Sequence, residues 1–186
     1  MNRIKGLIFL IIFGFLCILV VIQAGLNANE IKLPEDKKEE IIWDVVFEPD
    51  KETNEIVVNY TSGVEFTMPQ LFDSIVNDYD VTFTKPEEEI TYEFNLVNKS
   101  EYDAYILHYN KTKLSCIDDN DLCISNLDKI DYSFKYIDGE EVKEKDIIKA
   151  NETKRVIIKI KYNKNKEEIP MNLTKLGFNL TFAKVK

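Results

Sequence analysis

Apolar and polar residues alternate along most of the chain after residue 40. The segment 91–96 (TYEFNL) alternates one for one, and so does the segment 131–136 (DYSFKY). A period of two is typical of a β-strand with one buried face, because successive side chains point to opposite sides of the backbone. An apolar strand face is stable only when something covers it, so the alternation predicts an all-β fold built of stacked sheets.

Eight segments carry this pattern or a matching enrichment in Val, Ile, Tyr, Phe and Thr. They are residues 41–48, 54–60, 79–84, 90–97, 102–109, 131–137, 154–162 and 176–185. Turn residues separate them, among them Asp138-Gly139, which predicts a tight hairpin, and Lys85-Pro86. We therefore expect an immunoglobulin-like or jelly-roll β-sandwich of about seven or eight strands in residues 41–186, with a closed barrel as the alternative.

An uncharged apolar run, Leu7–Ile22, precedes this region. Arg3 and Lys5 stand before it with no acidic residue, which is the arrangement of a signal peptide or signal anchor whose downstream chain is exported. As a helix, residues 6–26 would span about 31 Å, enough to cross a bilayer. The length favours a single-pass anchor with its N-terminus inside over a cleaved signal peptide, and both interpretations of residues 1–29 stay open.

Residues 30–40 (EIKLPEDKKEE) hold mostly charged residues and a proline, which predicts a linker before the extracytoplasmic domain at 41–186. Without residues 1–29 the chain carries 22 Lys and Arg against 33 Asp and Glu, a net charge of −11. Nucleic acid and anionic lipid headgroups are therefore poor partners for the exported part.

Basic residues alternate in residues 154–161 (KRVIIKIK), a pattern that would suit an outer strand beside an acidic neighbour. The acidic segment 30–40 is one candidate for that neighbour, within the same molecule or in an adjacent one. The alternative is that residues 30–40 form a flexible stalk.

Several segments occur in an order known from one family. They are residues 43–48 (WDVVFE), 85–106 (KPEEEITYEFNLVNKSEYDAYI), 131–142 (DYSFKYIDGEEV) and 145–162 (KDIIKANETKRVIIKIKY). Together they resemble the TasA and camelysin-like surface proteins of low-GC Gram-positive bacteria. The resemblance implies an immunoglobulin-like sandwich in an exported protein of the cell surface or biofilm matrix. Residues 23–30 (QAGLNANE) depart from that family's Tyr-Ala-x-Phe type segment, so processing by its dedicated peptidase is not predicted.

Cys116 and Cys123 flank a short loop, CIDDNDLC, in the exported region. Two cysteines outside the cytoplasm usually pair, so we expect a disulfide between them. Inside the loop, Asp118, Asp119 and Asp121 offer oxygen ligands for a weak Ca²⁺ site. The loop lacks the glycine and terminal glutamate of a twelve-residue calcium loop, and a solvated acidic turn is the competing interpretation. No other cofactor is predicted.

The chain has one histidine, His108, and no H-E-x-x-H sequence. A zinc protease needs two histidines one helical turn apart, so the metalloprotease activity assigned to camelysin-like proteins is only a remote alternative here. No serine or cysteine triad is recognisable either. We interpret His108 as a structural strand residue that shares a face with Ala104 and Ile106.

Asn-x-Ser/Thr sequons are frequent. Their asparagines are Asn59, Asn98, Asn110, Asn151, Asn172 and Asn179. In a eukaryotic luminal domain they would accept glycans, whereas in a bacterial protein of this composition they would carry no meaning.

The sequence thus predicts a non-enzymatic surface or matrix protein, anchored in the membrane or secreted. It would act by association of its sandwich with itself or with other surface proteins. The alternative is a surface module that binds a glycan or Ca²⁺.

Overall fold

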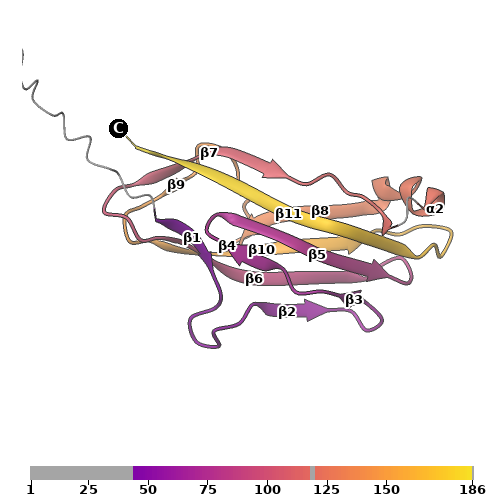
Figure 1. The fold of residues 1–186 in the computed structure, drawn as a ribbon. Coiled ribbons are helices and arrows are strands. Elements are labelled where there is room, and N and C mark those ends of the chain that lie inside the picture. Colours follow the sequence, from indigo (N-terminus) through magenta and orange to yellow (C-terminus); the bar gives the residue numbers. More distant parts are fainter. Residues whose placement is uncertain (1–43, 118–119, 186) are drawn as a thin grey trace, which may run out of the picture. The chain divides into compact units, whose positions relative to one another are not determined.

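Two antiparallel β-sheets pack face to face in the computed structural model, which describes residues 44–117 and 120–185 (Figure 1). The elements are β1 (Val45–Glu48), β2 (Val57–Tyr60), β3 (Glu65–Phe66), β4 (Gln70–Phe72), β5 (Ile75–Phe83), β6 (Glu89–Asn98), β7 (Ala104–Lys111), α2 (Asp121–Ile124), the 3₁₀ turn η2 (Leu127–Lys129), β8 (Ile130–Tyr136), β9 (Ile147–Ile148), β10 (Thr153–Tyr162) and β11 (Met171–Lys184).

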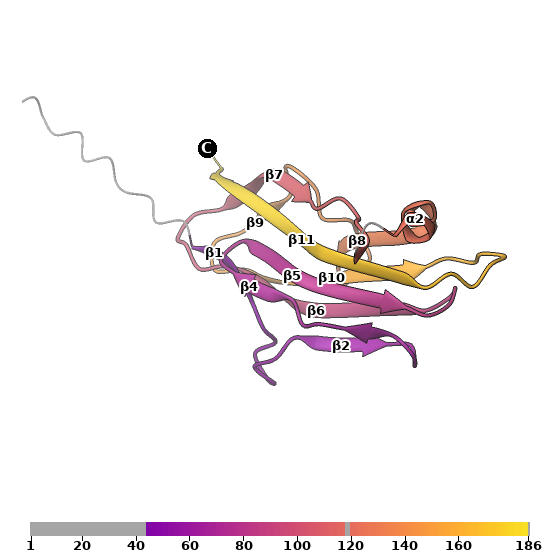
Figure 2. The same cartoon turned by 45° about the vertical axis from the view of Figure 1, so that its right-hand side comes forward.

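Sheet A has the strand order β1-β6-β10-β8, with β2 also beside β6. Sheet B has the order β3-β5-β11-β7-β9, with β4 also beside β5. The chain crosses between the sheets after β2 and then at every connection from β5 to β11 (Figure 2). The last strand of the chain, β11, lies inside sheet B between β5 and β7.

The predicted all-β sandwich is confirmed, and each of the eight predicted segments contains a strand. The short strands β3, β4 and β9 were not predicted, because two or three residues are too few to show a period. The predicted turn at Asp138-Gly139 is present. The Gly139 amide donates to the carbonyl of Tyr136 at 2.9 Å, and the returning chain makes a single bridge between Glu141 and Lys135.

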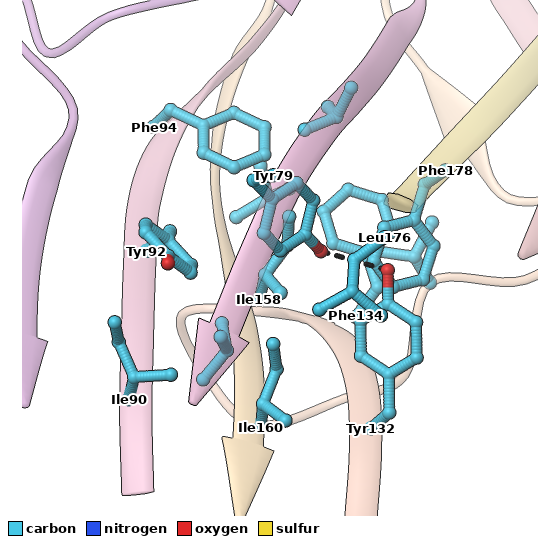
Figure 3. Close-up of a cluster of buried hydrophobic side chains, with 14 of the residues drawn as sticks. Tyr79, Ile90, Tyr92, Phe94, Tyr132, Phe134, Ile158, Ile160, Leu176 and Phe178 are labelled. Atoms are coloured by element: carbon cyan, nitrogen blue, oxygen red, sulfur yellow. Dashed lines mark hydrogen bonds between the residues drawn. The ribbon is translucent and has the colours of Figure 1, made fainter. Parts of the chain in front are cut away.

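The core fills the space between the sheets with aromatic and branched side chains, as Figure 3 shows. Alternate residues of β6 and β10 face inward and are completely buried, among them Ile90, Tyr92, Ile158 and Ile160. The rings of Phe134 in sheet A and Phe178 in sheet B lie 4.9 Å apart between centroids. The period of two in the sequence therefore corresponds to this buried face.

Gly177 marks the closest approach of β11 to β5. The pairing of these strands shifts register between Leu173 and Leu176 and again between Leu176 and Phe178, where this glycine lies. A Cβ atom placed on Gly177 would lie 2.5 Å from the carbonyl oxygen of Val76 and 3.1 Å from the Cα atom of Asn77. The carbonyl of Gly177 also accepts from the backbone amide and hydroxyl of Thr112. Only a residue without a side chain fits this position.

Asn98 holds the turn between β6 and β7 against β9. Its side chain is fully buried, and Nδ2 donates to the carbonyls of Tyr102, Ile148 and Lys149 at 2.9–3.0 Å. Its Oδ1 accepts from the backbone amide and hydroxyl of Ser100. The amide nitrogen of this sequon is thus used entirely within the fold.

Within residues 44–117 and 120–185, no helix is long and apolar enough to cross a membrane. The predicted membrane segment Leu7–Ile22 and the predicted linker at 30–40 lie outside the described residues.

Candidate functional site

The segment between β7 and β8 contains Cys116 and Cys123. The Sγ atoms of Cys116 and Cys123 lie at bonding distance, with the Cα atoms 6.1 Å apart, so the structure is compatible with the predicted disulfide. Cys116 bridges to Leu173 of β11, and both cysteines are buried. The Oδ1 atom of Asn120 accepts from the amides of Leu122 and Cys123, which caps the short helix α2.

The residues around the disulfide include large apolar side chains that face solvent. Leu122 is 63% exposed and Ile124 is 44% exposed. This exposure is not predicted from the sequence, because two apolar residues in a short loop show no period. We call Asp121, Leu122 and Ile124 the α2 tip.

The predicted Ca²⁺ ligands are described only in part. Asp118 and Asp119 lie outside the described residues, and Asp121 is exposed in α2. The described part of the chain contains no group of three His, Cys, Asp or Glu side chains arranged to hold a metal ion. The Ca²⁺ site therefore stays a prediction.

His108 lies on the outer side of β7, where its side chain is 61% exposed. Ala104 and Ile106 are buried, but a β-bulge in the pairing with β11 leaves Leu107 without a partner and reverses the alternation. The interpretation that His108 shares a face with Ala104 and Ile106 is therefore wrong. The nearest carboxylate is that of Glu144, with 3.7 Å between His108 Nδ1 and Glu144 Oε1.

The segment 154–161 does not form an outer strand, contrary to expectation. β10 lies between β6 and β8, and its outward basic side chains pair with acidic residues of neighbouring elements. Arg155 lies 3.3 Å from a carboxylate oxygen of Glu93, and Lys159 lies 2.9 Å from one of Glu89. No free edge of β10 is left for an acidic segment.

The strand β2 is an outer strand of sheet A. Its sequence, VVNY, has no charged residue and no proline. It pairs with β6 on one side, and no described strand pairs with its other side. Tyr60 at its end is 55% exposed, and its ring lies 4.8 Å from that of Phe66 in β3.

A second surface feature lies where β9 meets the end of β11. It is a hollow of about 340 Å³. We call it the β9 pocket, and it is lined by Tyr105, Lys145, Ile147, Lys184 and Val185. Ile147 is 47% exposed, and Lys184 also lies 3.3 Å from the ring centroid of Tyr102. The pocket thus combines apolar side chains with two lysines.

The most perturbed ionisable groups are structural tyrosines. Burial raises the pKa of Tyr79 well above its ordinary value of 10.0, and burial raises the pKa of Tyr109 to about 12. Both residues belong to the core and its margin, so these shifts report packing and do not mark a reactive centre.

Comparison with family models, with curated proteins and with solved structures finds no match. The resemblance to TasA and camelysin-like proteins therefore receives no support from these comparisons.

Proposed function

We propose that this chain is an exported surface or matrix protein that works by association of its β-sandwich with copies of itself or with other surface proteins. We assign no catalytic residue to it. The observation that carries the proposal is the open, uncharged edge of β2. Edges of this kind are usually blunted in soluble monomers, because their free N–H and C=O groups pair readily with another strand.

The other outer strands are protected. On β8, the amide of Tyr136 donates to the carbonyl of Glu140, and the amide of Val142 donates to that of Phe134. The outer side of β1 is engaged by a hydrogen bond from the amide of Phe47 to the carbonyl of Asp73. β3, β4 and β9 are only two or three residues long. Among the described strands, β2 therefore has the edge that is most open to pairing with a strand of another chain.

Export is part of the proposal, and the sequence supports it. The basic head before Leu7–Ile22 is typical of an exported chain. The geometry of Cys116 and Cys123 suits a disulfide, which persists only outside the reducing cytoplasm. Protease added to intact cells should degrade the domain at 41–186. If the domain is protected while a known surface protein is cleaved, export is excluded.

Sedimentation velocity of the full chain in mild detergent tests the association. We expect concentration-dependent oligomers, and we expect the double substitution Asn59→Lys and Tyr60→Lys to reduce them at least tenfold, since charges on the β2 edge oppose pairing. The matched control is Asn179→Lys with Thr181→Lys, which adds the same charge to exposed positions on a central strand. A wild-type chain that stays monomeric and captures no surface protein contradicts the proposal.

A glycan-binding module is the second candidate, and the exposed ring of Tyr60 beside the half-buried Phe66 favours it. Aromatic rings that face solvent are suitable platforms for the apolar faces of sugars. Titration of the full chain with soluble cell-wall glycan fragments, compared with Tyr60→Ala, distinguishes this candidate from self-association. Saturable binding that is lost in the variant would favour the module.

Thermal unfolding with and without Ca²⁺ tests whether the chain binds this ion, because a bound ion raises the melting temperature.

A further inference from the structure

Apolar side chains face solvent at two separate ends of the sandwich. Leu122 and Ile124 of the α2 tip are exposed at one end, and Ile147 of the β9 pocket is exposed at the other. In Figures 1 and 2, α2 lies at the right of the molecule, whereas β9 and the C-terminal end of β11 lie at the left. The two views agree, so the features belong to opposite ends.

The strand β11 gives the separation of these ends. Cys116, which begins the disulfide loop, bridges to Leu173 near the start of β11, and Lys184 of the β9 pocket is its last residue. A strand rises about 3.3 Å per residue, so these positions lie roughly 36 Å apart. One molecule cannot bring its own tip to its own pocket.

The α2 tip and the lining of the β9 pocket also carry opposite charge. Between Cys116 and Cys123 the sequence has three aspartates and no basic residue, and Asp121 of the described residues lies beside Leu122 on the α2 tip. The β9 pocket has Lys145 and Lys184 at its walls and no acidic residue in its lining. Each chain therefore carries an acidic apolar projection at one end and a basic apolar hollow at the other. This complementarity favours a second copy as the occupant of the pocket.

We propose that the α2 tip of one molecule docks into the β9 pocket of the next. This rests on the proposed self-association and adds a second, end-to-end contact to the pairing at β2. The contact is heterologous, since two different surfaces meet, and so each molecule keeps one free tip or pocket after pairing. Such contacts form open-ended rows instead of closed dimers unless the rotation happens to close a ring.

The short helix is well suited to this role. The disulfide and the Asn120 cap fix the backbone that carries Leu122, so little conformational freedom is lost on docking. The surface involved is small, so the contact is weak for a single pair and weakens further as salt screens the aspartates and lysines.

Mixing of two defective full-length chains provides the test. The tip variant is Leu122→Asp with Ile124→Asp, and the pocket variant is Ile147→Asp. We expect each variant alone to lose end-to-end association at least tenfold. An equal mixture of differently tagged variants, each also carrying Asn59→Lys and Tyr60→Lys to remove the β2 contact, should recover pairs by co-purification. The intact pocket of one then meets the intact tip of the other, and these pairs should not grow into rows.

Charge reversal provides a second test of the end-to-end contact. Asp121→Lys and Lys145→Asp should each weaken association, and mixing the two reversed chains should restore it. Met68→Asp is the matched control, because Met68 is 46% exposed and belongs to neither surface. Unchanged thermal melting of every variant separates lost contact from lost folding.

The outcomes distinguish the two proposals. If the β2 variant disrupts association while the tip and pocket variants associate like wild type, self-association stands and the end-to-end contact is wrong. Failure of the mixture to recover pairs also overturns this contact. If the wild-type chain does not associate at all, both proposals fall.

Discussion

The hydroxyl groups of Tyr79 and Tyr132 lie 2.8 Å apart and form a hydrogen bond across the centre of the sandwich (Figure 3). Tyr79 comes from β5 in sheet B, and Tyr132 comes from β8 in sheet A. The hydroxyl of Tyr132 also lies 3.2 Å from the carbonyl oxygen of Gly177, to which it donates, and we therefore assign Tyr79 as the donor to Tyr132. A chain of hydrogen bonds thus connects the two sheets inside a largely apolar core.

Removal of the two hydroxyls should have unequal effects. Tyr132→Phe leaves the buried Tyr79 hydroxyl without its acceptor, and we expect a loss of about 2 kcal/mol in the free energy of unfolding. Tyr79→Phe leaves the bond from Tyr132 to Gly177 intact, so we expect a loss of about 1 kcal/mol or less. Urea denaturation of both variants and of the double variant measures the coupling. Equal losses would contradict the assigned donor direction.

The buried tyrosines also predict the response to alkaline pH. Burial raises the pKa of Tyr79 and, to about 12, that of Tyr109, so the folded state keeps protons that the unfolded state releases near pH 10. Their contribution to stability is therefore complete below pH 10 and is lost as pH rises above it. Absorbance of tyrosinate at about 295 nm, followed with circular dichroism, should show these tyrosines ionising together with unfolding. Their ionisation in a fully folded domain would contradict this.

Gly177→Ala should destabilise the domain by about 2 kcal/mol or more, because the added methyl group meets backbone atoms that cannot move away easily. Thr181→Ala is the control, since Thr181 is exposed on the same strand. Thermal unfolding of both variants checks the difference. If Gly177→Ala is as stable as the control, the backbone of β5 must be able to move away from the added methyl group.

Asn98→Ala should cost about 2–4 kcal/mol, because the carbonyls of Tyr102 and Ile148 lose their buried donor. Asn110→Ala, at an exposed position, should have little effect. In a host that glycosylates sequons on folded domains, mass spectrometry should find Asn98 unmodified. A glycan on Asn98 of the folded chain would be incompatible with its buried Nδ2.

Removal of the disulfide should reduce the stability of the domain. Closing a loop of this length constrains the unfolded chain, so Cys116→Ser with Cys123→Ser should lower the free energy of unfolding by about 2–3 kcal/mol. Peptides prepared without reductant should contain Cys116 linked to Cys123. Complete labelling of both thiols in the chain recovered from cells would refute the pairing.

The period of two identified the long strands because it depends only on which face of each strand is buried. It could not show which strands lie at the edges, and so 154–161 was placed at an edge although β10 is central. It also failed at Leu107, since a bulge shifts every later side chain of β7 to the other face. The exposure of Leu122 depends on a short capped turn between sheets, and no local sequence pattern encodes that.

The central position of β11 has a consequence for the time course of folding. It pairs with both β5 and β7, and its residue Met171 lies opposite Phe83, far away in the sequence. Sheet B therefore cannot form until residues 171–184 have emerged, and long-range pairing of this kind is slow. In the interval, β5 and β7 expose the edges that β11 later covers. A newly made chain therefore passes through a stage in which pairing of these edges with neighbouring chains competes with completion of its own sheet.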